Sequence, residues 1–275
     1  MTGIEASPPC LIMVAPNGAR RSKADHPALP ISPAELADTA AACFEAGAAA
    51  IHLHVRDRDG RHSLDADAYR AALDAIRGAV GDRMVCQVTT EAVGRYAPAE
   101  QMAMVRDLRP EAVSLAIREL APDAASEPEA ARFFDWLRGE RIRPQYILYD
   151  AADVCRFNDL KARGVVPEDS AFLLFVLGRY AADQQSEPRE LLPFLAALDA
   201  RDRWAVCAFG RRESVCALTA AALGGHSRVG FENNFHLASG KVAEDNAALV
   251  AEAVAATGQV GRRVADAVAA RGEVL

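Results

Sequence analysis

Two histidines separated by a single residue are the feature of this sequence most suited to chemistry. They occur in the stretch Ile51-His52-Leu53-His54-Val55-Arg56-Asp57, whose alternation of apolar and polar residues predicts a β-strand. Because side chains two apart on a strand point to the same face, His52 and His54 are expected to project together. Paired imidazoles at a strand end suit a borderline divalent ion such as zinc, with coordination positions open for a substrate. The same pattern also fits two ordinary polar residues on a half-exposed strand, so the rest of the chain has to decide.

The elements that would position this pair alternate regularly along the chain. The clearest helix start is Ser32-Pro33-Ala34-Glu35, which combines a capping serine, a proline in the first turn and a capping-box glutamate. Strands are predicted at 10–15, 51–57, 84–89, 112–117, 145–149, 171–177, 204–209 and 226–230. Helices are predicted at about 32–46, 65–80, 98–108, 126–139, 151–163, 187–200, 212–223 and 241–256, with a helical tail at 261–270.

Eight strand–helix repeats with short connections predict a parallel sheet, since each crossover needs a helix outside it. Eight is the number that closes into a (β/α)8 barrel. An open doubly wound sheet is the second choice, because no Gly-x-Gly-x-x-Gly follows the first predicted strand. The 275 residues contain no Pro/Gly/Ser-rich linker. We therefore expect one (β/α)8 TIM-barrel domain over 1–275 with a C-terminal helical tail.

Composition excludes several classes of function. A net charge of −7 and a pI near 5.5 argue against a nucleic-acid surface, which needs clustered positive charge. Six cysteines without C-x-x-C spacing are typical of buried thiols in a reducing compartment. The sequence shows no signal peptide pattern and no apolar run near the roughly 20 residues that cross a bilayer. We expect a soluble, cytoplasmic protein with no membrane partner.

Active sites of barrels lie at the C-terminal ends of the strands, so polar residues there are candidates even when far apart in sequence. Closure would bring the last strand and its loop, with Arg228 and Glu232, beside the first two strands. Two histidines and one carboxylate can therefore converge, which is the ligand set of a catalytic metal site with an open face. The other candidates at strand ends are Asn17, Arg56, Gln87, Thr89, Thr90, Glu91, Ser114, Asp150, Asn233 and Asn234.

Three segments together resemble the β-keto acid cleavage enzymes, the family typified by 3-keto-5-aminohexanoate cleavage enzyme. They are Ala-Pro-Asn-Gly-Ala at 15–19, His-Leu-His-Val-Arg-Asp at 52–57 and Gly-Gly-His-Ser-Arg-Val-Gly-Phe-Glu-Asn-Asn at 224–234. The resemblance covers about 10–250. It implies a zinc-binding (β/α)8 barrel that is usually a homotetramer, and we expect a homo-oligomer, either a tetramer or a dimer. The implied reaction exchanges an acyl group between a β-keto acid and acetyl-CoA, giving acetoacetate and a new CoA thioester.

The family's functional residues carry over by position. The resemblance implies that His52, His54 and Glu232 are the ligands of a Zn²⁺ cofactor. It also implies that Arg228 is the active-site arginine and Thr89 a hydroxyl of the substrate pocket. The remaining substrate-binding candidates are Ser114, Asn17 and Asn233.

This chain departs from the family pattern where proton transfer is concerned. Asn233 stands where the family commonly has an aspartate that transfers a proton, and an asparagine cannot act as that base. Ile147 replaces a glutamate that many members carry on the fifth strand. Glu91 stands where members often have glycine. We hypothesise that Glu91 supplies the missing carboxylate, as a catalytic base or as the partner of a cationic substrate group.

These departures keep two other functions open. One is a metal-dependent lyase or hydrolase that acts on a small keto acid without CoA. The other is a non-catalytic barrel that binds a metal or another ligand. Of the remaining polar residues, we expect His62 in a surface loop or lid, and His226 in a hydrogen-bonded core position. Arg56 is expected to organise carboxylates near the metal or to pair with an aspartate, and the basic loop 20–23 to be solvated or to contact CoA phosphates.

Overall fold

The computed structural model describes residues 8–274 and contains a closed barrel of eight strands. The barrel strands are β1 Ile12–Val14, β2 Ala50–Leu53, β5 Val85–Thr89, β6 Ala112–Ala116, β7 Arg143–Leu148, β8 Phe172–Leu177, β9 Arg203–Ala208 and β10 His226–Val229. The α-helices are α1 Pro33–Glu45, α2 Ala66–Val80, α3 Pro98–Leu108, α4 Ile117–Leu120, α5 Glu127–Glu140, α6 Ala151–Ala162, α7 Leu191–Ala197, α8 Glu213–Ala222, α9 Asn246–Gln259 and α10 Ala267–Ala269. Short helical turns are η1 Gly81–Arg83, η2 Ala182–Gln184, η3 Pro188–Glu190 and η4 Ala270–Val274, and a separate hairpin is formed by β3 Val55–Arg56 and β4 His62–Ser63.

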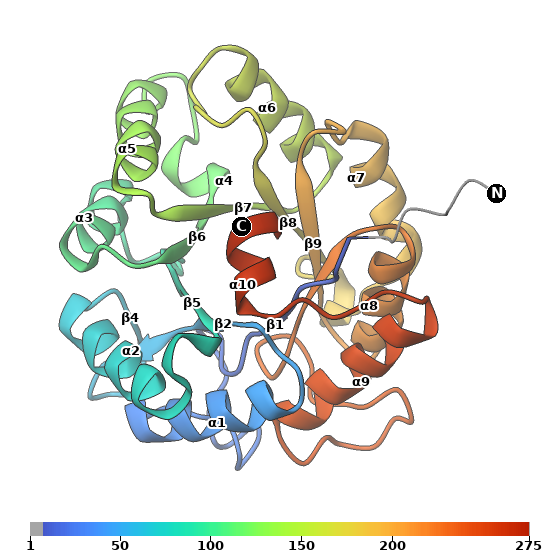
Figure 1. The fold of residues 1–275 in the computed structure, drawn as a ribbon. Coiled ribbons are helices and arrows are strands. Elements are labelled where there is room, and N and C mark those ends of the chain that lie inside the picture. The colour runs from blue at the N-terminus through green and yellow to red at the C-terminus, as the bar shows by residue number, and fades with distance from the viewer. Residues whose placement is uncertain (1–7, 275) are drawn as a thin grey trace.

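The barrel closes between the first and last of its strands. The order around it is β1-β10-β9-β8-β7-β6-β5-β2, and all of these neighbours pair in parallel. Helices surround the strands on the outside (Figure 1). The predicted (β/α)8 barrel is confirmed, and β2 and β10 both flank β1, as the candidate site requires. The predicted domain also includes 1–7 and 275, which lie outside the described residues.

Local signals placed most helix starts correctly. The Ser32 hydroxyl accepts from the Glu35 backbone N–H, and the Glu35 carboxylate accepts from the Ser32 backbone N–H, so the predicted capping box forms. The helix predicted at 241–256 instead begins at Asn246, where the Asp245 carboxylate accepts from the Ala248 N–H. The residues expected to form its first turn lie instead in a loop, where the Leu237 N–H donates to the Lys241 carbonyl.

The second predicted strand is broken into two pieces. β2 ends at Leu53, and β3 leaves the barrel to pair antiparallel with β4. The turn between them is held by the Asp57 carboxylate, which accepts from the backbone N–H groups of Asp59 and Arg61. His54 lies at the junction, where the chain turns away from the barrel wall. This hairpin was not predicted from the sequence, although the Asx turn that closes it is local.

The C-terminal segment closes the end of the barrel where the strands begin. A bridge joins Cys10 to Val264, and the Arg271 guanidinium pairs with the Glu111 carboxylate just before β6. Figure 1 shows α10 and the C-terminus across the centre of the barrel. The predicted helical tail at 261–270 is therefore extended at first and helical only from Ala267. Among the residues that the structure describes, no helix is long and apolar enough to cross a membrane.

Candidate metal centre

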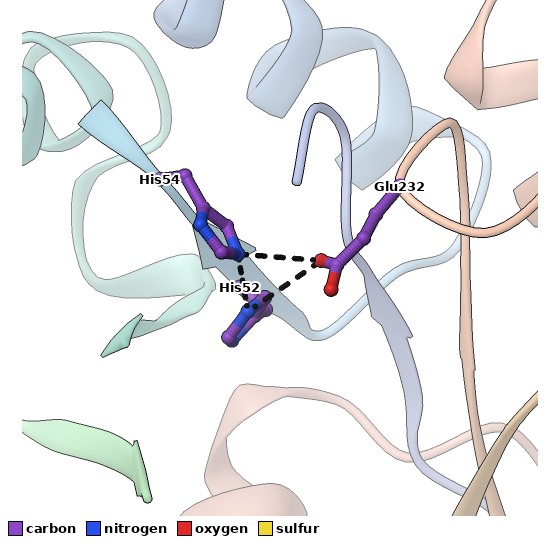
Figure 2. A group of neighbouring side chains, drawn as sticks. All are labelled: His52, His54 and Glu232. Carbon is purple, nitrogen blue, oxygen red and sulfur yellow. Dashed lines mark hydrogen bonds and ion pairs between the residues drawn. The ribbon is translucent and has the colours of Figure 1, made fainter. Parts of the chain in front are cut away.

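His52, His54 and Glu232 meet at the end of the barrel where the strands finish. The two histidines come from β2 and the residue after it, and Glu232 from the loop after β10 (Figure 2). The Nε2 atoms of the histidines are 3.1 Å apart, and each lies 3.5 Å from Glu232 Oε2. One ligand atom from each residue lies within 4.8 Å of the other two, so the three side chains are close enough to bind one ion.

Hydrogen bonding fixes which nitrogen of His52 faces the centre. His52 Nδ1 lies 2.8 Å from the amide oxygen of Gln87, which can only accept, so Nδ1 carries the proton. The Gln87 amide nitrogen in turn donates to the Gln145 amide oxygen over 3.2 Å, which sets the orientation of Gln87. The lone pair of His52 is therefore on Nε2 and directed at the other two ligand atoms.

A second hydrogen-bonded chain does the same for His54. His62 Nε2 donates to the carbonyl of Glu91 over 2.9 Å, which leaves His62 Nδ1 as an acceptor 3.4 Å from His54 Nδ1. His54 therefore carries its proton on Nδ1 and its lone pair on Nε2. His62 is only 3% exposed, and burial followed by the nearby His54 lowers its pKa to about 3. The expectation of a surface or lid position for His62 is wrong, because the β3–β4 hairpin folds it back against the centre.

The protonation states suit ligands of a cation. Burial, followed by the Arg228 charge, lowers the pKa of His52 well below its usual value. Burial opposes the charged form of Glu232, but the Arg228 guanidinium beside it holds its pKa well below the usual range. Neutral imidazoles and an ionised carboxylate are the forms that bind metals.

The protein alone leaves the converging lone pairs without a donor. Glu232 Oε2 is buried and has no hydrogen-bond partner among residues 8–274. Three lone pairs directed at one another repel, and a cation between them would relieve that repulsion. Two imidazole nitrogens and a carboxylate oxygen form a donor set that suits zinc and leaves a coordination position open. The residues present therefore fit a divalent ion.

The backbone around the centre is held by residues after β1. The Asn17 amide accepts from the His54 N–H over 3.2 Å and donates to the carbonyls of His54 and Pro30 over 2.9 and 3.1 Å. Asn17 is fully buried, and its amide holds the backbone of His54 and Pro30. The substrate-binding role of Asn17 stays a prediction. Gly18 has φ of +57°, and a Cβ there would lie 2.6 Å from Cγ of Glu232. Only glycine fits this close approach without displacing the carboxylate.

Arg56 holds the same loop from the other side. Its guanidinium donates to the carbonyls of Asn17, Gly18 and Arg21, and no carboxylate within residues 8–274 forms an ion pair with it. Only Nη2 makes these bonds, while Nε and Nη1 are buried without a partner among the described residues. The expected ion pair with an aspartate does not form, and the charge of Arg56 acts on Glu232 and Glu91 without direct contact.

Arg228 lies beside the carboxylate ligand. Its guanidinium is 3.2 Å from Glu232 Oε1 and donates to Cys207 Sγ over 3.5 Å. It is only 4% exposed, and its Nε has no hydrogen-bond partner among the described residues. A buried N–H without an acceptor is costly, so this donor is suited to an anionic or carbonyl oxygen of a substrate.

The ligands open into a hollow at the barrel mouth, which we call the metal hollow. It is also lined by Thr89, Glu91, Arg179, Arg228 and an apolar wall. The Thr89 hydroxyl accepts from the Glu91 N–H over 3.1 Å. The Glu91 carboxylate pairs with Arg20 at 2.7 Å through Oε1, while Oε2 lies 3.9 Å from His54 Nδ1. The predicted residues Thr89, Glu91 and Arg228 are thus brought together with the ligands.

Ser114 and Asn233 lie outside the lining of this hollow. Ser114 is fully buried on β6, level with Thr89, and its hydroxyl has no partner among the described residues. The Asn233 amide faces the Glu213 carboxylate at 3.4 Å. Neither position supports the predicted contact with substrate.

Glu213 is a buried carboxyl that was not predicted as part of the site. It accepts from the backbone N–H of Gly230 over 3.1 Å and from the side-chain amide of Asn234 over 3.3 Å. Burial raises its pKa to about 8. Through these contacts Glu213 anchors the loop that carries Glu232. It stands in the first turn of a predicted helix without any motif, so no signal in the sequence distinguished it from a helix-start glutamate.

His226 is the first residue of β10 and lies at the end of the barrel away from the metal hollow. Its Nδ1 accepts from the Leu11 N–H over 3.0 Å, which matches the hydrogen-bonded core position expected for it.

Comparisons with known proteins agree with this geometry. The family described as beta-keto acid cleavage enzyme matches residues 9–274. A 3-oxoadipate:acetyl-CoA acetyltransferase from Cupriavidus necator is 31% identical over 271 residues, covering 96% of this chain and 93% of the relative. A 3-keto-5-aminohexanoate cleavage enzyme from Fusobacterium nucleatum is 29% identical, covering 93% of each chain. A 3-dehydrocarnitine:acetyl-CoA trimethylamine transferase from Rhizobium meliloti is 27% identical, covering 88% of each.

Solved structures share the fold. ObcA in a ternary complex with a C4-CoA adduct and oxalate has a TM-score of 0.74 at 18% identity, covering 90% of this chain and 67% of that one. A type I 3-dehydroquinate dehydratase from Clostridium difficile has a TM-score of 0.56 at 8% identity, covering 90% of this chain and 92% of that one. At these identities the likeness concerns the barrel alone.

Proposed function

Because this chain belongs to the β-keto acid cleavage enzyme family, we propose that it is a zinc-dependent enzyme that converts a β-keto acid and acetyl-CoA into acetoacetate and a new acyl-CoA. The observation that supports this most is the convergence of His52, His54 and Glu232 in a hollow that also holds Arg228 and Glu91. Relatives with similar sequences over nearly their whole length are named for transfers that use acetyl-CoA.

His52, His54 and Glu232 would hold the zinc ion through the two Nε2 atoms and Oε2. Bound there, zinc would supply a Lewis acid for the ketone oxygen of the substrate. The protein's part is to orient the imidazoles so that each Nε2 faces the ion, which the contacts of their Nδ1 atoms to Gln87 and His62 accomplish.

Arg228 would bind the carboxylate of the β-keto acid or an oxyanion that develops near it. Its Nε lacks another acceptor, and its planar fork suits two oxygens of one carboxylate. The guanidinium is already fixed by Glu232 and Cys207, so little ordering is needed when the substrate binds.

Glu91 is the carboxylate that we assign to proton transfer. Asn233 cannot serve as a base and faces Glu213, whereas Glu91 Oε2 lines the metal hollow. The ion pair with Arg20 leaves Oε2 available and keeps the carboxylate aimed at the hollow. Glu91 would remove a proton from C2 of the β-keto acid.

The bonds that form and break balance over the whole exchange. C2 of the β-keto acid attacks the acetyl carbonyl, and the C–S bond of acetyl-CoA breaks to release the CoA thiolate. The thiolate then adds to the original ketone carbon, and the C2–C3 bond breaks. The acyl part leaves as a CoA thioester. C2 regains the proton from Glu91 and leaves in acetoacetate.

The outer part of the mouth suits the second substrate. Arg20 and Arg21 line a neighbouring hollow that shares Glu91 and Glu232 with the metal hollow. We propose that acetyl-CoA approaches from this side, with its phosphates toward the basic loop 20–23. A homo-oligomer, tetrameric or dimeric, and a cytoplasmic location are further parts of the proposal.

The deciding experiment uses zinc-loaded protein and a panel of β-keto acids, each with and without acetyl-CoA. We expect acetoacetate and a new CoA thioester in equal amounts, and no consumption of the keto acid when acetyl-CoA is omitted. Consumption that ignores acetyl-CoA would show a lyase or hydrolase instead. Zinc binding without turnover of any acid would show a non-catalytic barrel.

The role of Glu91 is tested separately. Glu91→Gln keeps the size of the side chain but removes the base, so kcat for exchange should fall about 10²-fold or more. Zinc content should stay near that of the unchanged protein, because Glu91 is outside the ligand set. Turnover at the normal rate would show that another group moves the proton.

A further inference from the structure

The names of the relatives do not determine which chemical group the β-keto acid carries at the end away from its reacting carbons. The residues that line the metal hollow indicate the class of this group. The wall of the hollow on the side of β7, β8 and β9 is apolar and consists of Ile147, Tyr149, Val176 and Phe209. This wall offers contact to methylene groups. Above it lies Arg179, two residues beyond the end of β8.

The other charged groups of the hollow are already paired within the protein. Arg228 lies 3.2 Å from Glu232, and Glu91 lies 2.7 Å from Arg20. Because Glu91 is neutralised by Arg20, it is not an unpaired anion that would attract a cationic substrate group. This weighs against the role of Glu91 as the partner of a cation.

Arg179 is different. Within residues 8–274 no carboxylate lies within ion-pair distance of its guanidinium, whose carbon lies over the Phe209 ring at 5.2 Å from the ring centre. The residue is half-buried and lines both the metal hollow and the outer hollow. An arginine that rests on an aromatic ring keeps its N–H groups in a fixed plane and free to bind an anion.

The positions of the two arginines define what fits between them. Arg228 is on β10, and Arg179 follows β8. The strand between these two is β9, and Phe209 directly follows it. The hollow thus has a buried cation at its base, an apolar wall and an unpaired cation at its rim.

We infer that the substrate is a β-keto diacid and that Arg179 binds its far carboxylate. The inference rests on the proposed function and adds the chemical class of the substrate. The near carboxylate and the ketone lie with Arg228 and the metal ligands, the methylene groups lie along Val176 and Phe209, and the second carboxylate meets the fork of Arg179. A substrate with a cationic far end would meet Arg179 as a like charge.

The phosphates of acetyl-CoA do not account for Arg179. The whole pantetheine arm separates them from the reacting carbonyl. A cation that lines the same hollow as His52 and His54 is too close to the reacting atoms to meet them. Arg20 and Arg21, which line only the outer hollow, are better placed for that contact.

The test compares two substrates that differ only at the far end, 3-oxoadipate and 3-oxohexanoate, each with acetyl-CoA and zinc-loaded protein. A charge-assisted contact predicts a preference of about 10- to 100-fold in kcat/KM for the diacid. Arg179→Gln should remove that preference and change kcat/KM for the monoacid less than about threefold. The matched control is Arg211→Gln, which removes an exposed arginine after β9 that does not line the metal hollow and should keep the preference.

Two kinetic results would overturn the inference. One is equal kcat/KM for the two acids in the unchanged protein. The other is an Arg179→Gln protein in which KM for acetyl-CoA rises while KM for the diacid does not, because Arg179 would then belong to the CoA site.

A binding experiment separates this inference from the proposed function. Adipate and hexanoate are inert, so their binding to the zinc-loaded protein can be measured by calorimetry whether or not the protein turns over any keto acid. Tighter binding of adipate that Arg179→Gln abolishes supports the anion site even if no exchange is found. Equal binding of the two acids overturns the inference even if exchange is found.

Discussion

The two ends of the barrel each contain a buried histidine, and the comparison shows what marks a functional site. His52, where the strands finish, is 1% exposed, and His226, where they begin, is 5% exposed. Burial lowers the pKa of both. They differ in the partner of the lone pair: His226 Nδ1 accepts from the Leu11 N–H, whereas His52 Nε2 faces the lone pairs of His54 and Glu232. Neither burial nor a lowered pKa distinguishes the site, but the missing donor does.

The surroundings of the two histidines differ in the same way. At the beginning of the strands, the apolar residues Leu11, Phe172 and Ala270 pack together, and the Arg262 guanidinium donates to the carbonyls of Ala221 and Gly225. The lone pair of His226 and these donors of Arg262 have partners within the protein. At the other end, Glu232 Oε2 and Arg228 Nε are buried without partners in the described chain. Polar groups that a fold buries without partners cost free energy, and a ligand that pairs with them recovers it.

The strongest test of this comparison is to remove each histidine in turn. His52→Ala deletes a metal ligand, so we expect zinc content to fall and kcat/KM for exchange to drop on the order of 10³-fold, since a Lewis acid supplies several kcal/mol. His226→Asn keeps an acceptor near the position of Nδ1 and should leave kcat/KM within about threefold of the unchanged protein. The measurements are metal analysis and steady-state kinetics. If His226→Asn lost as much activity as His52→Ala, the two ends would not differ as proposed.

The next test concerns the proton on His52. Gln87→Leu removes the acceptor of the Nδ1 proton, and we expect zinc affinity to fall about 10- to 100-fold, as is usual when such a partner is lost. Gln87→Glu keeps an oxygen at that place and serves as the matched control, with zinc affinity close to that of the unchanged protein or higher. Competition against a chelator measures both. Equal zinc affinity for the Leu and Glu variants would mean that Gln87 has no part in orienting the ligand.

Much of the fold could be predicted because its signals are local. The capping box of Ser32 and Glu35 predicted the start of α1. The regular alternation of apolar runs predicted the eight barrel strands and most helices to within a few residues. The hairpin of β3 and β4 and the short helix α4 were missed, because each is shorter than the window in which hydrophobic periodicity can be detected. The tail was predicted as a continuous helix, since its pairing with Cys10 depends on a contact far away in the sequence.

The site could be predicted only where a motif carried it. The H-x-H pair and the carboxylate after the last strand stood out by residue type and spacing, and the barrel brings them together. The hydrogen-bonded chains behind them did not stand out, since they join residues such as His52 with Gln87 and His62 with Glu91 across different elements. Asn17 was predicted at the mouth, but its side chain turned out to clamp the backbone of His54, which no pattern of residue types reveals.

A smaller effect is expected at the glycine beside Glu232. Gly18→Ala would place a methyl group 2.6 Å from Cγ of Glu232, so the carboxylate must move and zinc affinity should fall about tenfold. Gly60→Ala is the control: Gly60 also has a positive φ, of +76°, but a Cβ there would meet nothing within 4 Å. Both variants should lose about 1 kcal/mol of stability from backbone strain, but only Gly18→Ala should lose zinc affinity. Unchanged zinc affinity in Gly18→Ala would show that the ligand tolerates displacement.

The smallest expected effect is the pH dependence of stability at the other end of the barrel. Burial, followed by the charge of Arg262, lowers the pKa of His226 to about 3 in the folded state, against 6.5 for an ordinary histidine. The unfolded chain therefore binds more protons than the folded one between these values. The stability contributed by neutral His226 is present above pH 6.5 and is lost as the pH falls toward 3.

Between pH 7 and pH 5.5 this single group should cost the zinc-free protein about 1 kcal/mol, since one pKa unit corresponds to about 1.4 kcal/mol. His226→Asn removes the titrating group, so its stability measured by urea unfolding should fall less over the same interval. Every other titrating group is common to the two proteins and cancels in the difference. Identical pH slopes for the two proteins would mean that the Leu11 N–H does not hold His226 neutral, and the contrast with His52 would then rest on zinc binding alone.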